Sequence, residues 1–119
     1  MLIKRTDEVA AIDASDGTQI RELLHPERHG VEMGSSLAHA TLPPGSRSRP
    51  HRLKNTEVYY ILEGTGTMHV GDESSDVGPG DAIYIPPMSV QYIENEGDGD
   101  LTFLCIVDPA WRAEDDETL

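Results

Sequence analysis

The chain has 119 residues, a length typical of one domain, and carries 22 acidic against 9 basic residues for a net charge of −13. So negative a surface repels phosphate groups and anionic lipids, which disfavours a role in binding nucleic acid or membrane surfaces. The single cysteine excludes an intramolecular disulfide, and no apolar run reaches the length of a signal peptide or membrane span, so we predict a cytoplasmic protein.

Short segments rich in β-branched and aromatic residues follow one another along the chain, separated by turn signals such as PPG, EGTG and VGPGD. The segment TQIRELL (18–24) can be read as helix or strand, HPERH (25–29) reads as a loop, and the acidic GDESSD (71–76) reads as a turn. The tail after Trp111 adds a short turn or stays loose. Many short strands with frequent turns predict an antiparallel sandwich or barrel. Strands are expected at SSLAHATL (35–42), VYYIL (58–62), TMHV (67–70), AIYIP (82–86), VQYI (90–93) and LTFLCIV (101–107).

The stretch PHRLKNTEVYYILEG (50–64) carries the strongest chemical signal. In a small β-barrel, alternate residues of each strand point inward, so polar side chains of matching parity converge on the interior. His51 and Leu53 share a parity, and Glu57 shares its parity with Tyr59. The pattern predicts an imidazole and a carboxyl group that face one hollow.

Two parts of the chain resemble the two sequence motifs of the cupin superfamily, in the right order and at matching spacing. The first motif is represented by Gly45, His51, Leu53, Glu57 and Gly64, and the second by Gly80, Pro86, Met88, Gln91 and Asn95. The fifteen residues between the two motifs are similar in number to those of compact single-domain cupins from bacteria and archaea.

The resemblance covers roughly residues 30–110 and implies an all-β fold, the double-stranded β-helix or jelly-roll barrel, in one domain over residues 1–119. Residues 1–29 are then an N-terminal extension, and residues 111–119 are an acidic C-terminal tail. The resemblance also implies a homodimer and a metal ion inside the barrel, held by three histidines and a glutamate.

Two of the four implied ligand positions are changed. Leu53 has no electron pair to donate, and Gln91 offers a neutral amide oxygen, a weaker ligand than imidazole for Zn, Fe or Ni. The donors that remain are those of His51, Glu57 and Gln91. They form a reduced site for one divalent ion, of the Mn, Fe, Ni or Zn type or a harder ion such as Ca or Mg, or they hold no metal at all.

Alternatives stay open for each candidate residue. His51 and Glu57 are a metal-binding pair, an acid–base pair that acts catalytically on a bound molecule, or a buried pair kept for packing. Gln91 faces the pocket or is an ordinary buried amide. The further candidates are Leu53, Tyr59 and Tyr84 for contact with a ligand, and His25 or His39 as replacement metal ligands.

Two other residues carry structural expectations. Met88 stands where the second motif has a glycine, so its turn either avoids a positive φ or bears strain. Cys105 lies in the apolar run LTFLCIV, without a nearby basic residue, and is expected to be an inert buried side chain.

Two classes of function are compatible with the sequence. The first is a small barrel protein that binds a small polar metabolite, of the sugar or organic-acid type, with a reduced metal site at His51, Glu57 and Gln91. The alternative is a metal-dependent cupin enzyme, an isomerase, lyase or dioxygenase, that acts on a small acid or sugar. Stoichiometric metal in the purified protein would favour the enzyme.

Overall fold

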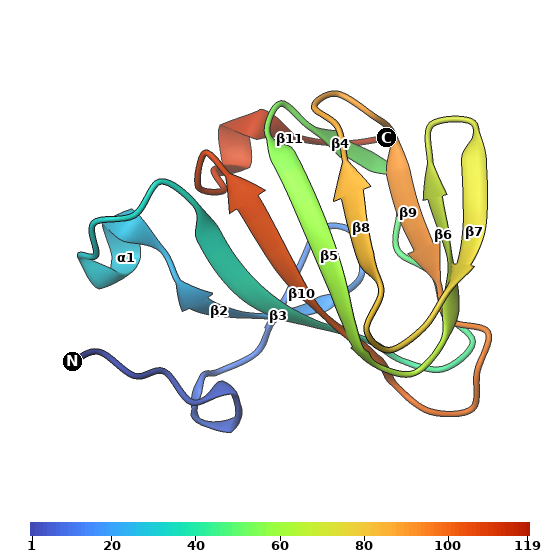
Figure 1. The fold of residues 1–119 in the computed structure, drawn as a ribbon, viewed down its shortest axis with the longest axis horizontal. Helices are drawn as coiled ribbons and strands as arrows, with labels where there is room; N and C mark the ends of the chain where they lie inside the picture. Colours follow the sequence, from blue (N-terminus) through green and yellow to red (C-terminus); the bar gives the residue numbers. More distant parts are fainter.

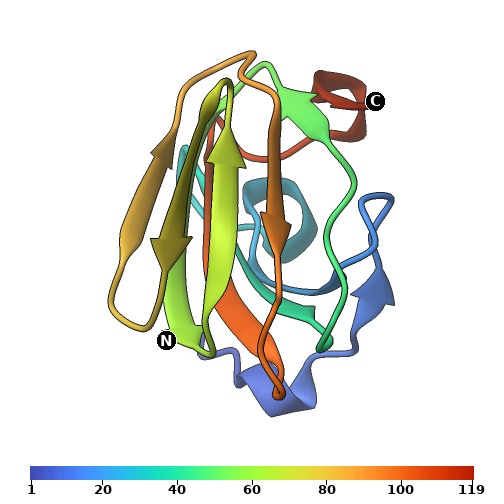
Figure 2. The same ribbon diagram turned by 90° about the vertical axis from the view of Figure 1, so that its right-hand side faces the viewer.

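The computed structural model describes all 119 residues and consists of two antiparallel β-sheets that face each other (Figure 1). Figure 2 shows the smaller sheet in front of the larger one. The larger sheet has the order β1 (Ile12–Asp13), β2 (Gln19–Leu24), β3 (Ser36–Leu42), β10 (Leu101–Asp108), β5 (Thr56–Glu63) and β8 (Ala82–Ile85). The smaller sheet has the order β11 (Asp116–Thr118), β4 (His51–Leu53), β9 (Gln91–Glu94), β6 (Gly66–Val70) and β7 (Glu73–Val77).

Helical structure is limited to one turn of α-helix, α1 (Pro26–His29), and two 3-10 turns, η1 (Thr6–Glu8) and η2 (Ala113–Asp115). None of these elements has the length and apolar character needed to cross a membrane. The predicted all-β jelly-roll barrel is confirmed, and each of the six predicted strands is present within a residue or two of its expected ends. The ambiguous segment 18–24 forms β2.

Two local predictions are wrong, each because a polar segment forms regular structure. HPERH contains α1, since the His25 side chain accepts a hydrogen bond from the Glu27 N–H and caps the turn. GDESSD enters β7, an exposed edge strand that pairs with β6 along its whole length. The acidic tail forms the short turn η2, one of the two alternatives predicted for it, and then β11, which pairs with β4 over Asp116–Thr118.

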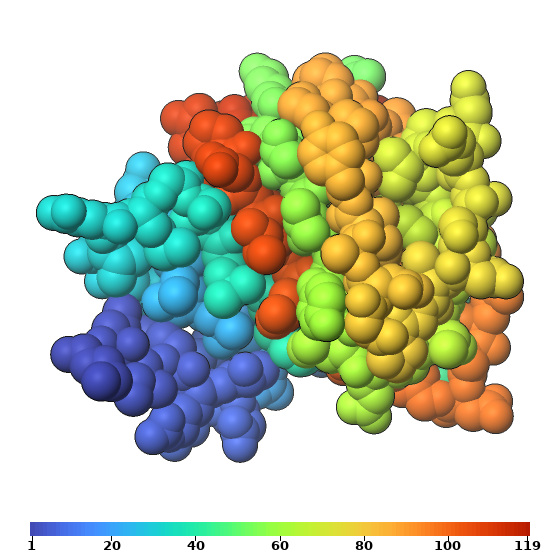
Figure 3. All heavy atoms as spheres, viewed as in Figure 1, coloured from blue at the N-terminus to red at the C-terminus, as the bar shows by residue number.

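Residues 1–29 also take part in the barrel. β1 and β2 extend the larger sheet next to β3, with Ile20 opposite Ala40. Only the first residues stand apart: they form the blue lobe in Figure 3, where Met1, Leu2 and Ile3 are exposed. The structure therefore places β1 and β2 of the N-terminal segment, and β11 of the C-terminal tail, in the two sheets.

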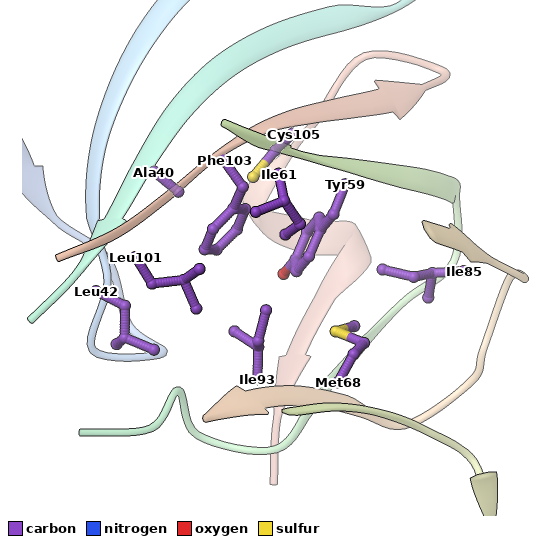
Figure 4. Packing of buried hydrophobic residues seen from close by; sticks show 10 residues of the cluster. All are labelled: Ala40, Leu42, Tyr59, Ile61, Met68, Ile85, Ile93, Leu101, Phe103 and Cys105. Carbon is purple, nitrogen blue, oxygen red and sulfur yellow. The ribbon is translucent and has the colours of Figure 1, made fainter. Parts of the chain in front are cut away.

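The core follows from strict alternation along the central strands. On β10, Leu101, Phe103, Cys105 and Val107 are buried while the residues between them are more exposed. Phe103 lies opposite both Ala40 of β3 and Ile61 of β5 in the strand register. Figure 4 shows these side chains reaching toward Met68 and Ile93 of the smaller sheet. One face of each sheet is thus apolar, and burying those two faces against each other stabilises the barrel.

Gly64 of the first motif occupies a position that excludes any other residue. Its φ is +84°, and a Cβ there would lie 2.6 Å from the carbonyl oxygen of Asp100. The glycine is therefore required by both conformation and space at the turn between β5 and β6.

Met88 is the one non-glycine residue with a positive φ, at 67°. Its N–H donates a hydrogen bond to the Leu53 carbonyl oxygen at 2.7 Å, which holds the turn against β4. Of the two sequence-based alternatives, the strained turn is therefore the one that the chain adopts.

Met88→Gly is expected to raise the free energy of unfolding by about 0.5–1 kcal/mol, because glycine adopts this φ without the Cβ clash and little apolar burial is lost from a side chain that is 49% exposed. Urea denaturation measures the change. Met88→Ala is the control, since alanine removes the same side chain but keeps the Cβ. Equal stabilities of the two variants would contradict a strained backbone.

Candidate functional site

A cavity of about 380 Å³ lies between the two sheets. Its wall comes from the loop between β1 and β2, from β3, β5 and β10 of the larger sheet, from β4 of the smaller one, and from residues 111–116. The wall is mostly apolar, with a few polar side chains. This size and composition are typical of a site for a small molecule.

β4 contributes His51 and Leu53 to the cavity wall, as their shared parity predicted. Both are buried, with exposed fractions of 5% and 3%. His51 Nδ1 lies 3.1 Å from the carbonyl oxygen of Arg49 and 4.0 Å from Asp16 Oδ2. Because both of these neighbours are acceptors, the proton of a neutral His51 belongs on Nδ1, which leaves Nε2 as an acceptor.

Glu57 and Gln91 form a hydrogen bond between the two sheets. Glu57 comes from β5 and lines the cavity, whereas Gln91 comes from β9, where it is the cross-strand partner of His51, and is fully buried. Gln91 Nε2 donates to Glu57 Oε1 at 2.8 Å, and Gln91 Oε1 has no partner. The structure thus places His51 and Glu57 on the cavity wall, whereas Gln91 contacts Glu57 but is not part of the wall. The prediction that Gln91 contacts the ligand is therefore corrected, and the alternative of a buried amide is the one that the chain adopts.

Burial raises the pKa of Glu57 from its ordinary value of 4.5 to about 8. The hydrogen bond from Gln91 acts in the opposite direction, and the negative charges of Asp116 and Asp16 add to the rise. With this pKa, the Glu57 carboxyl group holds its proton through most of the neutral range and releases it just above. Such a group is suited to proton transfer.

Tyr59 and Tyr84, both predicted to contact a ligand, lie in different environments. Tyr59 is 3% exposed and lines the cavity with its ring 4.5 Å from that of Phe103, centroid to centroid. Tyr84 is 62% exposed on the outside of β8, because alternation there turns Ile83 and Ile85 inward. The prediction that Tyr84 contacts a ligand inside the barrel is therefore wrong.

His25 and His39, which were predicted as possible replacement metal ligands, both lie outside this site, so that prediction is wrong. Both ring nitrogens of His25 form hydrogen bonds within the protein. Nε2 bonds to the Trp111 carbonyl oxygen at 2.8 Å, and Nδ1 accepts a hydrogen bond from the Glu27 N–H at the start of α1. His39 has the opposite parity to Ala38 and Ala40, which line the cavity, so it points to the outer face of β3. Burial, followed by the charge of Arg21, lowers the pKa of His39.

Among the residues of the cavity wall that sequence reasoning missed are Asp16, Trp111 and Asp116. Trp111 Nε1 donates to Asp116 Oδ2 at 3.1 Å, and Asp16 accepts two hydrogen bonds from Thr18. All three lie in the terminal segments, where acidic residues resemble those of a solvated surface. The one signal was Trp111, the single tryptophan of an otherwise polar tail.

The donor set does not form a metal site of the kind that the resemblance implied. No group of three or more His, Cys, Asp or Glu side chains is arranged to hold a metal ion. His51 and Glu57 supply one nitrogen and one carboxylate, and the unpartnered Gln91 Oε1 adds one neutral oxygen. This set lacks two of the three imidazoles that the resemblance implied, and a neutral amide oxygen is a weaker ligand than imidazole for a transition metal.

Residues 38–107 match the Cupin_2 family model, described as the cupin domain, which covers more than half of the chain. The chain belongs to the cupin family. The predicted family membership is thus confirmed.

Known relatives of this cupin include a protein of Methanocaldococcus jannaschii named "Uncharacterized protein MJ1618", which is 44% identical over 115 residues, 95% of this chain and 90% of the relative. An "Oxalate-binding protein" of Thermotoga maritima is 35% identical over 72 residues, 60% of each chain. A crystal structure of a predicted oxalate decarboxylase, also from Thermotoga maritima, has a TM-score of 0.79 and 27% identity, covering 91% of this chain and 99% of its own.

Proposed function

We propose that this cupin binds a small polar molecule in the cavity between its two sheets. His51 and Glu57 face the polar end of the ligand, and Leu53, Tyr59 and Phe103 form the apolar side. The observation that carries the proposal is the juxtaposition of a buried imidazole and a buried carboxyl group on the wall of a cavity of about 380 Å³. Gln91 holds the Glu57 carboxyl group in position through its 2.8 Å hydrogen bond.

The ligand classes predicted from the sequence were a sugar and an organic acid. The relatives named for oxalate support an organic acid. The cavity wall supports a ligand without negative charge, because a free dicarboxylate would meet the negative charges of Asp16 and Asp116. An organic acid therefore needs a cation beside it, and the only donor set predicted for one is His51, Glu57 and Gln91.

The second candidate is an enzyme, and one observation favours it. A Glu57 carboxyl group with a pKa of about 8, on the wall of a cavity beside an imidazole, is equipped to donate or accept a proton at neutral pH. An isomerase or lyase reaction fits such a pair. The metal-dependent form of this candidate stays a prediction, as do the homodimer and the cytoplasmic location.

Thermal shift and titration calorimetry with a panel of sugars, sugar alcohols, carboxylic acids and amines test the binding function. We expect at least one compound to bind with a stoichiometry of one and to stabilise the fold by about 2.7 kcal/mol at a hundred times its dissociation constant. His51→Ala is expected to abolish that stabilisation, whereas Tyr84→Ala, on the outer surface, preserves it. A panel without any binding compound would contradict the proposal.

The same protein, purified without chelator, is analysed for metal by mass spectrometry. Stoichiometric metal that is lost in Glu57→Ala would support the reduced metal site at His51, Glu57 and Gln91. Conversion of a binding compound into a product, by protein treated with EDTA, would support proton transfer by Glu57 and His51 without a metal.

A further inference from the structure

The charges on the cavity wall are almost all of one sign. The side chains that carry negative charge are Asp13, Asp16, Glu22 and Asp116, and Glu57 adds a carboxyl group that is mostly protonated at neutral pH. The one lysine or arginine on the wall is Arg28, and it is committed to Glu22 through an ion pair of 2.9 Å. The remaining carboxyl groups have no partner of permanent positive charge, although they surround a space large enough for a ligand.

Some hydrogen-bond acceptors on the wall are left without a donor from the protein. The Trp111 indole N–H donates to one oxygen of Asp116, and the other oxygen, Oδ1, is buried without a partner. Gln91 is not part of the wall, so its unpartnered Oε1 does not count among these acceptors. His51, which is 5% exposed, leaves Nε2 as a further acceptor. Since an unpaired buried acceptor costs free energy, the site is completed by a molecule that brings donors.

The rest of the wall suits an apolar body next to a positive charge. Tyr59, Phe103 and Trp111 each line the cavity. Aromatic faces attract cations through their quadrupole, and in a site shielded from water this attraction is worth more than at the surface. Acidic groups and aromatic rings therefore lie around the same space.

We propose that the ligand of this cavity is a small organic cation, a protonated amine with an apolar body. Its N–H groups donate to Asp16, Glu57 and Asp116, and its body lies against Tyr59 and Phe103. The proposal rests on the small-molecule binding proposed above and narrows its ligand class. An organic cation fits better than a metal ion, because the carboxyl groups are spread around the wall and do not converge as a metal cluster.

Benzylamine, benzyl alcohol and benzoate test the charge preference, since they share one ring and differ in charge. Titration calorimetry uses full-length protein treated with EDTA, at pH 7.5. We expect benzylamine to bind about tenfold or more tightly than benzyl alcohol, and benzoate to bind more weakly than either. Equal affinities, or tighter binding of benzoate, would overturn the cation proposal while leaving small-molecule binding intact. The absence of binding by all three, and by the wider panel, would overturn both.

Charge-neutral variants identify the groups that carry the preference. Asp16→Asn and Asp116→Asn keep one acceptor oxygen each for Thr18 and Trp111, so the local hydrogen bonds survive. Each variant is expected to weaken benzylamine binding about tenfold and to leave benzyl alcohol unchanged. Glu73→Gln, on the exposed edge strand β7, is the matched control with no expected effect. Unchanged benzylamine affinity in both cavity variants, with thermal unfolding confirming the fold, would overturn the assignment.

Discussion

Replacing Leu53 and Gln91 together by histidine is expected to raise the affinity for Zn²⁺ or Mn²⁺ by more than about a hundredfold. Leu53 and His51 are buried on the same side of β4, and Gln91 is the cross-strand partner of His51 and bonded to Glu57. Two added imidazoles would therefore join His51 and Glu57 around one point and complete a set of three nitrogens and one carboxylate. Competition with a fluorescent chelator measures the affinity.

The control for this double variant places two histidines where they cannot share an ion. Arg52→His and Ile106→His lie outside the barrel, on β4 of the smaller sheet and β10 of the larger sheet, and should give no tight binding. Adding Glu57→Gln to the double-histidine variant should reverse most of the gain. A double-histidine variant that folds, yet binds no better than the wild type, would show that these four positions do not converge.

Between pH 5 and pH 8, the wild-type protein is expected to lose stability relative to Glu57→Gln by about 1.4 kcal/mol per pH unit. The native state holds the Glu57 proton up to a pKa of about 8, whereas the unfolded chain releases it near 4.5. The native state therefore binds more protons in this interval, so its stability falls as pH rises. The stabilisation of the native state by the Glu57 proton is fully present below pH 4.5 and is lost as the pH rises through 8.

Urea denaturation at a series of pH values measures this difference. Glutamine at position 57 keeps a carbonyl oxygen for the Gln91 N–H but cannot ionise, so the hydrogen bond between the sheets is retained. Glu63→Gln, an exposed position on the same strand, is the control, and its curve should run parallel to that of the wild type. A Glu57→Gln curve that is also parallel would contradict the burial-induced rise in the pKa of Glu57.

The predicted strands rest on local physics. The β-branched and aromatic residues of 58–62 and 101–107 predicted two strands, which are β5 and β10, and the shared parity of Glu57 and Tyr59 predicted that both face inward. The same parity argument placed His51 and Leu53 on one side, with Glu57 on the next strand. Tyr84 was predicted to contact a ligand without such an argument, and in the structure Ile83 and Ile85 are the inward side chains of its strand. Where two apolar residues flank a tyrosine, the amphipathic ring takes the surface position.

By itself, the sequence predicted an antiparallel sandwich or barrel, the buried imidazole and carboxyl group, and the glycine turns, because each depends on residues close together in the chain. The jelly-roll barrel was predicted by the resemblance to the two cupin motifs. Only the tertiary structure decided that Asp16, Trp111 and Asp116 complete the cavity wall, that Gln91 donates to Glu57, and that His25 and His39 stay outside. These features depend on which distant segments pair: β11 on β4, and β1 and β2 beside β3. Such pairings are determined by burial and hydrogen bonding over the whole sheet. Short polar segments such as EDDE have no local pattern from which the pairing could be predicted.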